Sequence, residues 1–206
     1  DYAMRHPCHD TLDAIKANAR FPLLIKPRTQ IYLESGIKGS LVQRPEELDA
    51  DLERYRSLVK FNDALISRHP DIADPQFQEY LTAAETSIYS VSGFVTKEGT
   101  LVARASMKVL QRPRKAGIGL CFESRPLEPA VLDKLQALCA RIGYHGAFEV
   151  EYIADGDRRL MIDFNPRFFS QMAFDVARGV PIPTFAWLGA RGEDAELERR
   201  VKAARD

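Results

Sequence analysis

A chain of 206 residues has room for one large domain or for two small lobes, each built around a hydrophobic core. Its 29 basic and 29 acidic side chains give a formal net charge of zero, which argues against a nucleic-acid binder held mainly by phosphate contacts. No apolar run is long enough to span a membrane, and the first residues lack a basic-then-apolar signal pattern. The three cysteines have no CxxC spacing and fit reduced thiols, so a cytoplasmic protein is expected.

The first part of the chain is predicted to form a lobe with a strand, a glycine turn and a helix. Residues 21–27 are mostly apolar and form a strand that ends near Lys26, and residues 36–40 place Lys38 between two glycines. Backbone amides of such a turn can approach a phosphate, but the spacing of a P-loop is missing, and a lysine at a strand end is often a surface residue. An amphipathic helix is expected from Pro45 to His69.

The second part of the chain opens with a predicted antiparallel strand pair. Residues 77–81 read as a strand that leads from the first lobe to the second. Residues 85–95 and 101–109 have the alternating pattern of strands, and the Lys-Glu-Gly sequence between them predicts a turn. Lys108 lies on the returning strand.

A basic loop with glycines follows over residues 111–119, and Arg112 lies at its start. The loop is either a solvated basic turn or an anion-binding loop, and the residues alone leave both interpretations open. A helix is expected over residues 128–142, with Gly143 as its C-cap.

The most informative stretch is residues 143–167, which read as two strands joined by a turn. A two-residue turn at the Asp-Gly pair would set Glu151 opposite Leu160 and bring a charge into the apolar row. A loop of three or five residues would instead set Asp163 opposite Glu149 or Glu151, so an odd-length loop is predicted. The polar residues of the two strands then share one face: Glu149, Glu151, Asp163 and Asn165.

Carboxylates gathered on one face repel each other unless a cation lies between them. Carboxylate and amide oxygens suit a hard ion, magnesium above all, and magnesium usually keeps positions for water and substrate phosphates. The sequence Asn165-Pro166-Arg167 fits such a site, because the amide can bind the metal and the arginine can bind an anion. The alternative is that these acids are the solvated face of an antiparallel sheet.

These segments, in this order, resemble the ATP-grasp superfamily of carboxylate–amine ligases. The closest resemblance is to its ATP-dependent carboligase branch, which includes D-aspartate-ligase-like proteins. It runs from Phe21 to about Trp187 and is most specific in GAFEVEY, which ends at Tyr152, and in DFNPR, which starts at Asp163. It implies an α+β fold of two lobes whose antiparallel sheets enclose a nucleotide site. The expected lobes are residues 1–77 and residues 78–206.

The resemblance also implies roles for individual residues. Glu151, Asp163 and Asn165 match the residues that hold two Mg²⁺ ions on ATP, with Mn²⁺ as the alternative metal. Asp163 stands where the family usually has a glutamate. The residues implied in nucleotide binding are Lys26, Lys38, Gln78, Glu79, Leu81, Glu85 and Lys108. Those implied in catalysis are Lys108, Arg112 and Arg167.

The function implied by the resemblance is an ATP-dependent ligase that activates a small carboxylate as an acyl phosphate for attack by an amine. Such a reaction needs no enzyme nucleophile, and no convincing Ser-His-Asp or Cys-His set is found. The alternatives are a nucleotide-binding module without catalysis, kinase-type phosphoryl transfer on the same fold, and a plain α+β interaction domain. Because the family carries a further N-terminal domain, a second copy or a domain of a longer protein is expected to complete the acceptor site.

Overall fold

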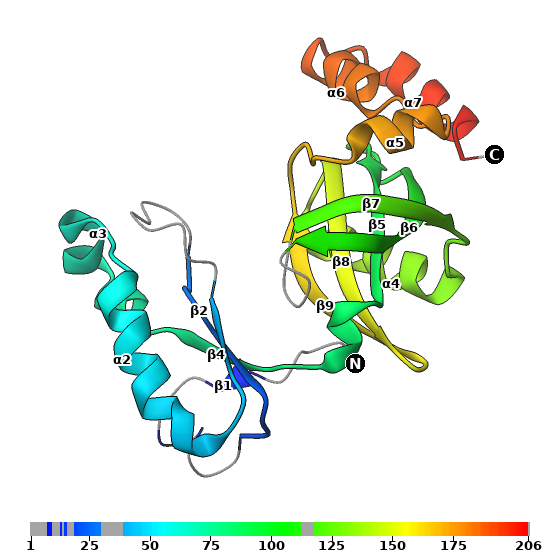
Figure 1. Cartoon of the computed structure of the whole chain (residues 1–206). Helices are drawn as coiled ribbons and strands as arrows, with labels where there is room; N and C mark the ends of the chain where they lie inside the picture. The colour runs from blue at the N-terminus through cyan, green and yellow to red at the C-terminus, as the bar shows by residue number, and fades with distance from the viewer. Residues whose placement is uncertain are drawn as a thin grey trace. The chain divides into compact units, whose positions relative to one another are not determined.

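The computed structural model describes residues 8–9, 13, 15, 19–29, 39–112 and 118–205. Contacts divide the described residues into two units, one ending at Thr82 and the other beginning at Ala83 (Figure 1). Each unit has its own antiparallel sheet and its own hydrophobic core, which confirms the predicted α+β class. The boundary that the sequence suggested, between residues 77 and 78, lies inside a strand. None of the helices in the described part of the chain is long and apolar enough to cross a membrane.

The unit that ends at Thr82 is built on a four-stranded antiparallel sheet. Its strand order is β1-β4-β2-β3. One face of the sheet is apolar because Leu23, Ile25 and Phe77 point to the same side and are buried in the core. The strands are β1 (Cys8–His9), β2 (Leu23–Lys26), β3 (Ser40–Val42) and β4 (Gln76–Glu79).

Helices supply the rest of this core through Leu48, Leu52 and Tyr55 at helical spacing. The single helix predicted from Pro45 to His69 is wrong. Val59 is extended, with ψ of 115°, and the side chain of Asn62 accepts a hydrogen bond from the amide of Ala64, so a second helix begins there. The elements are η1 (Pro45–Glu47), α2 (Leu48–Leu58), α3 (Asp63–Arg68) and η2 (Pro70–Ala73).

The unit that begins at Ala83 is built on a five-stranded antiparallel sheet of order β7-β6-β5-β8-β9. Its central strand β5 is buried along its whole length. A short 3-10 helix, η3 (Thr82–Glu85), precedes β5, so Glu85 lies before the strand and not in it. The strands are β5 (Ile88–Val95), β6 (Leu101–Arg112), β7 (Ile118–Arg125), β8 (Gly146–Asp155) and β9 (Arg158–Asn165).

Helix α4 (Pro129–Ile142) covers one face of this sheet. Its buried residues Val131, Leu135 and Cys139 are spaced four apart and pack in one cluster with the apolar row of β8, which includes Phe148 and Val150. As predicted, Gly143 ends the helix, with a φ of 65° that a residue without a side chain adopts readily. This face of the sheet is therefore a closed hydrophobic core.

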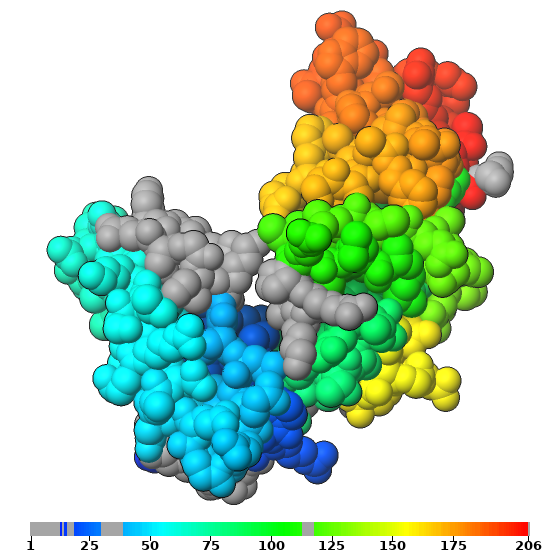
Figure 2. Space-filling model, viewed as in Figure 1, coloured from blue at the N-terminus to red at the C-terminus, as the bar shows by residue number. Residues whose placement is uncertain are grey.

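Three C-terminal helices cover one end of the opposite face (Figures 1 and 2). They bury Phe94 of β5 and Ala147 of β8 against Phe185, whose ring meets that of Phe94 edge-on at 5.7 Å. The rest of that face carries the polar side chains described below. The helices are α5 (Met172–Ala177), α6 (Ile182–Ala190) and α7 (Asp194–Ala203).

The β8–β9 hairpin corrects the predicted loop length. Its loop is Gly156-Asp157, two residues and not an odd number. Regular pairing from this loop would set Ile162 opposite Glu151, but the register shifts between Glu151 and Tyr152, and Ile162 is the extra residue. Asp163 is thus opposite Glu151, as one of the predicted pairings required, and a β-bulge supplies the odd residue.

Candidate functional site

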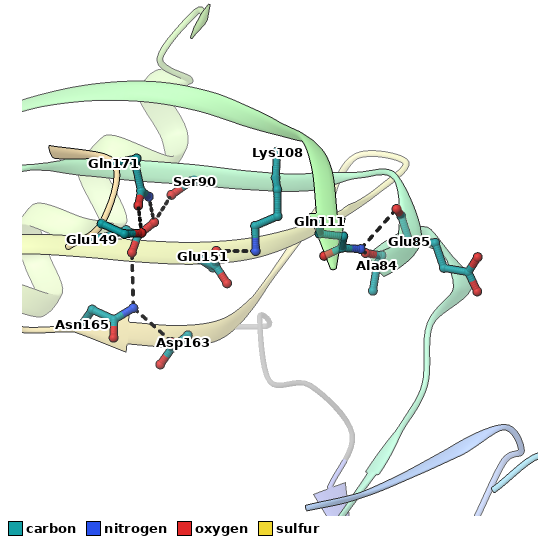
Figure 3. Close-up of polar contacts among 11 residues, drawn as sticks. Ala84, Glu85, Ser90, Lys108, Gln111, Glu149, Glu151, Asp163, Asn165 and Gln171 are labelled. Carbon is teal, nitrogen blue, oxygen red and sulfur yellow. Dashed lines mark hydrogen bonds and ion pairs between the residues drawn. The ribbon is translucent and has the colours of Figure 1, made fainter. Parts of the chain in front are cut away.

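The polar face of the second sheet brings the predicted acids together, as Figure 3 shows. Across three neighbouring strands, Ser90 is opposite Glu151, which is opposite Asp163. In the next row, Ser92 of β5 is opposite Glu149, which is opposite Asn165. Directly opposed side chains on one face have Cβ atoms about 5 Å apart. The four predicted residues of the hairpin therefore form one polar cluster.

Lys108 enters this cluster from β6 and meets Glu151. Its Nζ lies 2.7 Å from Oε1 of Glu151, and the two side chains are only 5% and 18% exposed. A charged pair that is so far removed from water stays favourable only while both partners are present. The family resemblance implied a role for both residues, but it gave no sign that they contact each other.

Glu149 has a different environment, although it is only two residues from Glu151. It is 6% exposed and accepts hydrogen bonds from Oγ of Ser90 at 2.9 Å and from Nε2 of Gln171. Burial, reinforced by the negative charge of Glu151, raises the pKa of Glu149 to about 7, although the Ser90 hydrogen bond opposes this. Glu149 therefore exchanges a proton near neutral pH.

Asn165 connects the acids to Arg167. Its Nδ2 donates to Oδ2 of Asp163 at 3.0 Å and to Oε2 of Glu149 at 3.4 Å, and its Oδ1 accepts from Nη2 of Arg167 at 2.8 Å. Arg167 also donates from Nη1 to the carbonyl oxygen of Phe168 at 2.9 Å. The amide thus joins an exposed guanidinium to the carboxylates.

The donor set of the cluster fits a hard cation. Glu151 and Asp163 present carboxylates on adjacent strands, and the third oxygen ligand would be that of the Asn165 amide, which accepts from Arg167 in this structure. The raised pKa of Glu149 comes mainly from burial, and the negative charges of Glu151 and Asp163 add to it. Among residues 8–9, 13, 15, 19–29, 39–112 and 118–205, no group of three or more His, Cys, Asp or Glu is placed to hold a metal ion, so a metal held in this cluster would need a ligand of another type, such as the amide.

Other predicted residues of this unit lie at the end of β6. Arg112 is exposed at the last position of that strand. The buried Gln111 beside it donates from Nε2 to the carbonyl oxygens of Ala84 and Glu85, at 3.1 and 3.2 Å. Gln111, which sequence reasoning missed, thereby attaches the Glu85 segment to the sheet.

In the unit that ends at Thr82, the predicted residues lie on or beside two paired strands. Lys26 of β2 is opposite Gln76, and Gln78 of β4 is opposite Leu24, so Lys26 and Gln78 share the face away from the hydrophobic core. Gln78 is buried, whereas Lys26, Glu79 and Leu81 are half-buried. Lys38 lies outside the described residues.

Sequence reasoning missed the polar residues that support the acids. Ser90, Ser92 and Gln171 are examples, and Ser92 donates to the buried carboxylate of Asp175 at 2.6 Å. A usable signal was present in β5, because serines inside a fully buried strand need hydrogen-bond partners. No comparable local pattern marks Gln171, which lies in the irregular segment after β9.

No protein-family model matches the chain. No curated protein sequence matches it either. Solved structures do match, and those described next are 11% to 18% identical to the chain.

The biotin carboxylase domain of Hydrogenobacter thermophilus 2-oxoglutarate carboxylase, solved with MgADP, ADP and bicarbonate, matches over 97% of this chain with a TM-score of 0.62 and 18% identity. The L-amino acid ligase of Bacillus licheniformis matches over 89%, with a TM-score of 0.60 and 11% identity. N5-carboxyaminoimidazole synthase of Aspergillus clavatus, solved with ADP and its ribonucleotide, matches over 80%, with a TM-score of 0.51 and 16% identity. The chain spans 41%, 42% and 40% of these three chains, respectively.

Proposed function

The chain has the ATP-grasp fold that these structures share, as the sequence predicted, and we propose that it acts as an ATP-dependent carboxylate–amine ligase. The observation that carries the proposal is the polar cluster on the second sheet. There the buried Lys108–Glu151 pair, Asp163 and the Asn165–Arg167 contact meet on one face. Solvated acids would not need a buried lysine or the support of buried serines.

The reaction proceeds in two steps with ATP as a substrate. An oxygen of the substrate carboxylate attacks the γ-phosphorus, the bond to the β,γ-bridging oxygen breaks, and ADP leaves. The nitrogen of an amine then attacks the acyl carbon, phosphate leaves with the bonding electrons, and the amine loses a proton. Activation as an acyl phosphate turns a poor electrophile into a good one, so the protein has to position the reactants and balance their charge.

Five polar residues of the second unit are proposed to have tasks in this scheme. Glu151, Asp163 and Asn165 would hold magnesium, or manganese in its place, and the metal would neutralise the phosphate charge of ATP. Lys108 can turn from Glu151 to a terminal phosphate oxygen, and Arg167 can hold the carboxylate or the transferred phosphoryl group. Loss of one such cation is expected to lower the rate roughly 10²- to 10³-fold.

The remaining predicted residues are proposed for nucleotide binding. Gln78, Glu79 and Leu81 would recognise adenine through the backbone, and Glu85 the ribose hydroxyls. Lys26 and Lys38 would bind phosphate oxygens, and Arg112 would support the transferred group. The Gln111 contact to the Glu85 segment supports this assignment, because a residue that binds ribose needs a fixed backbone. The substrates are proposed to be a small carboxylate and a small amine.

Calorimetric titration of ATP into the chain, with and without magnesium, tests the proposal. Binding should require magnesium. Glu151→Gln should raise the Kd of MgATP by at least roughly 10- to 100-fold, which is the effect of losing a residue that only supports a metal ligand. Glu123→Gln, which removes an exposed carboxylate from the edge strand of the same sheet, is the matched control and should leave the Kd unchanged. ATP binding that ignores magnesium and Glu151 would favour a non-catalytic nucleotide module.

A further inference from the structure

A cavity of about 470 Å³ lies in the second unit, beside the segment that carries Arg167. Its floor is formed by the ends of β5 and β8, where Phe94 and Ala147 are buried. Its walls come from residues 166–168, which directly follow β9, and from helices α6 and α7. Most of the surface that lines it is apolar. A cavity of this size is in the range of small-molecule sites.

Small residues on α6 keep the cavity open. Ala186, Gly189 and Ala190 line it, and their spacing of three and four places them on one side of the helix. A Cβ atom built on Gly189 would lie 3.5 Å from Leu197 of α7, which is ordinary contact, so small size at this position is not forced by helix packing. The space is therefore a property of this helix face that larger side chains would remove.

One edge of the cavity carries a guanidinium that can bind an anion. The hydrogen bonds of Arg167 to Asn165 and to the carbonyl oxygen of Phe168 use two of its five N–H groups. Another cation that lines the cavity, Lys97, is paired with Asp194 at 3.2 Å. Next to Arg167, the side chain of Phe168 is 52% exposed, although it is large and apolar. A binding group for an anion and an apolar surface thus lie side by side at this edge of the cavity.

We propose that this cavity binds the apolar body of the substrate, an aliphatic or aromatic carboxylic acid whose carboxylate pairs with Arg167. The inference rests on the proposed function and names the substrate class for it. A planar guanidinium binds a carboxylate in a fixed orientation. A carboxylate held there lies next to Asn165 and hence next to Asp163, where the phosphates of ATP are proposed to bind. The apolar cavity thus extends away from the reacting group and selects the acyl chain.

A series of unbranched acids tests the proposal on the whole chain. Acetate, butanoate and hexanoate are titrated by protein-observed NMR in the presence of magnesium and β,γ-imido-ATP, and nucleotide binding is measured separately by calorimetry. Each methylene that enters the cavity should lower the Kd by roughly threefold to fourfold, the factor that corresponds to burial of one CH₂ group. Ala190→Phe should abolish this dependence on chain length and leave nucleotide affinity unchanged. Ala190 is exposed, so the variant is expected to fold.

Ala137→Phe is the matched control, because Ala137 is an exposed residue of α4 that does not line the cavity, and it should keep the dependence on chain length. If the nucleotide binds but the three acids bind with equal affinity, the proposed cavity is overturned and the proposed function stands. Chain-length dependence without nucleotide binding would support the cavity and overturn the ligase. If Ala190→Phe keeps the dependence of Kd on chain length, the proposal is also overturned, because the acyl chain of the acid would then bind elsewhere.

Discussion

Two glutamates on one strand show how much a local environment decides. Glu151 lies next to a buried ammonium, whereas Glu149 is held by a hydroxyl and an amide, which carry no full charge. The Lys108 charge lowers the pKa of Glu149 less than burial and Glu151 raise it. We therefore assign different tasks to the two acids. Glu151 contributes to metal binding, and Glu149 orients Asn165 by accepting a hydrogen bond from its Nδ2.

The raised pKa of Glu149 predicts that the protein loses stability as the pH rises. In the unfolded chain this carboxyl loses its proton near its ordinary pKa of 4.5, whereas the folded state keeps the proton up to about pH 7. The folded state therefore binds more protons between these values, and stability that is present below pH 4.5 is lost as the pH rises through 7. Glu149→Gln removes this titration. In buffer without divalent cations, the fall in the free energy of unfolding between pH 5 and pH 8.5 should be smaller in the variant by about 2–3 kcal/mol at most.

Urea denaturation at several pH values measures this difference. Glu123→Gln serves again as the control, because its carboxylate is exposed and the variant should keep the pH dependence of the original chain. Magnesium should reduce the difference between the original chain and Glu149→Gln, because a bound cation favours ionised acids. Parallel pH profiles for the two chains would contradict the prediction.

At the scale of elements, the β8–β9 hairpin shows what the sequence could and could not predict. Alternation identified the four polar residues of one face, since burial of the opposite row fixes which residues point together. The sequence did not predict where the odd residue lies that sets Asp163 opposite Glu151. An odd loop and an even loop with a bulge give the same pairing of Glu151 with Asp163, and only three-dimensional packing distinguishes them.

Deletion of Ile162 tests whether the bulge serves only to set the pairing of Asp163 with Glu151. Without this residue the two-residue loop leads directly into a regular ladder in which Asp163 remains opposite Glu151 and Asn165 opposite Glu149. The deletion should therefore keep magnesium-dependent ATP binding and cost only about 1–2 kcal/mol of stability. Deletion of Phe164 is the comparison. It should abolish that binding, because Asn165 would move to the core face, where Phe164 packs edge-on against Tyr144. Calorimetry of the two variants would show whether they differ.

Elements with weak local signals were predicted less well. The helix expected from Pro45 to His69 breaks because Val59 and Phe61 are buried in the core in non-helical positions, a tertiary effect that helical spacing hides. Strand β7 was not predicted, since its side chains are mostly exposed and carry no clear alternation. Helix α6 was not predicted either. Proline breaks a helix interior, but Pro183 lies in the first turn of α6, where proline is tolerated.

At the scale of the whole molecule, the sequence predicted which polar residues of the hairpin share a face, but not the residues that support them. The family resemblance implied Glu151, Asp163 and Asn165, and the register places all three on one face. The partners Ser90 and Gln171 come from distant parts of the chain, and their approach to Glu149 depends on the packing of β5 and on the segment after β9. Contacts of this kind follow from tertiary structure, which no local pattern encodes.

The two units have separate hydrophobic cores, so we expect them to unfold separately in the absence of ligand. The core of the first unit includes Leu23 and Tyr55, whereas the second unit buries Phe148 under α4 and Phe185 under its C-terminal helices. Differential scanning calorimetry should then show two transitions. A ligand that binds only folded protein stabilises the part that holds it by about 2.7 kcal/mol at a concentration 100 times its Kd.

Saturating MgATP should therefore raise both transitions if residues of both units bind the nucleotide, as we propose. In Glu151→Gln both shifts should be smaller at the same nucleotide concentration, because the metal site of the second unit is lost and the nucleotide binds more weakly. Hydrogen exchange at Leu23 and Phe148, one core residue from each unit, would assign each transition. A shift confined to the second unit would show that the nucleotide is held there alone, and the roles proposed for Lys26 and Gln78 would then be wrong.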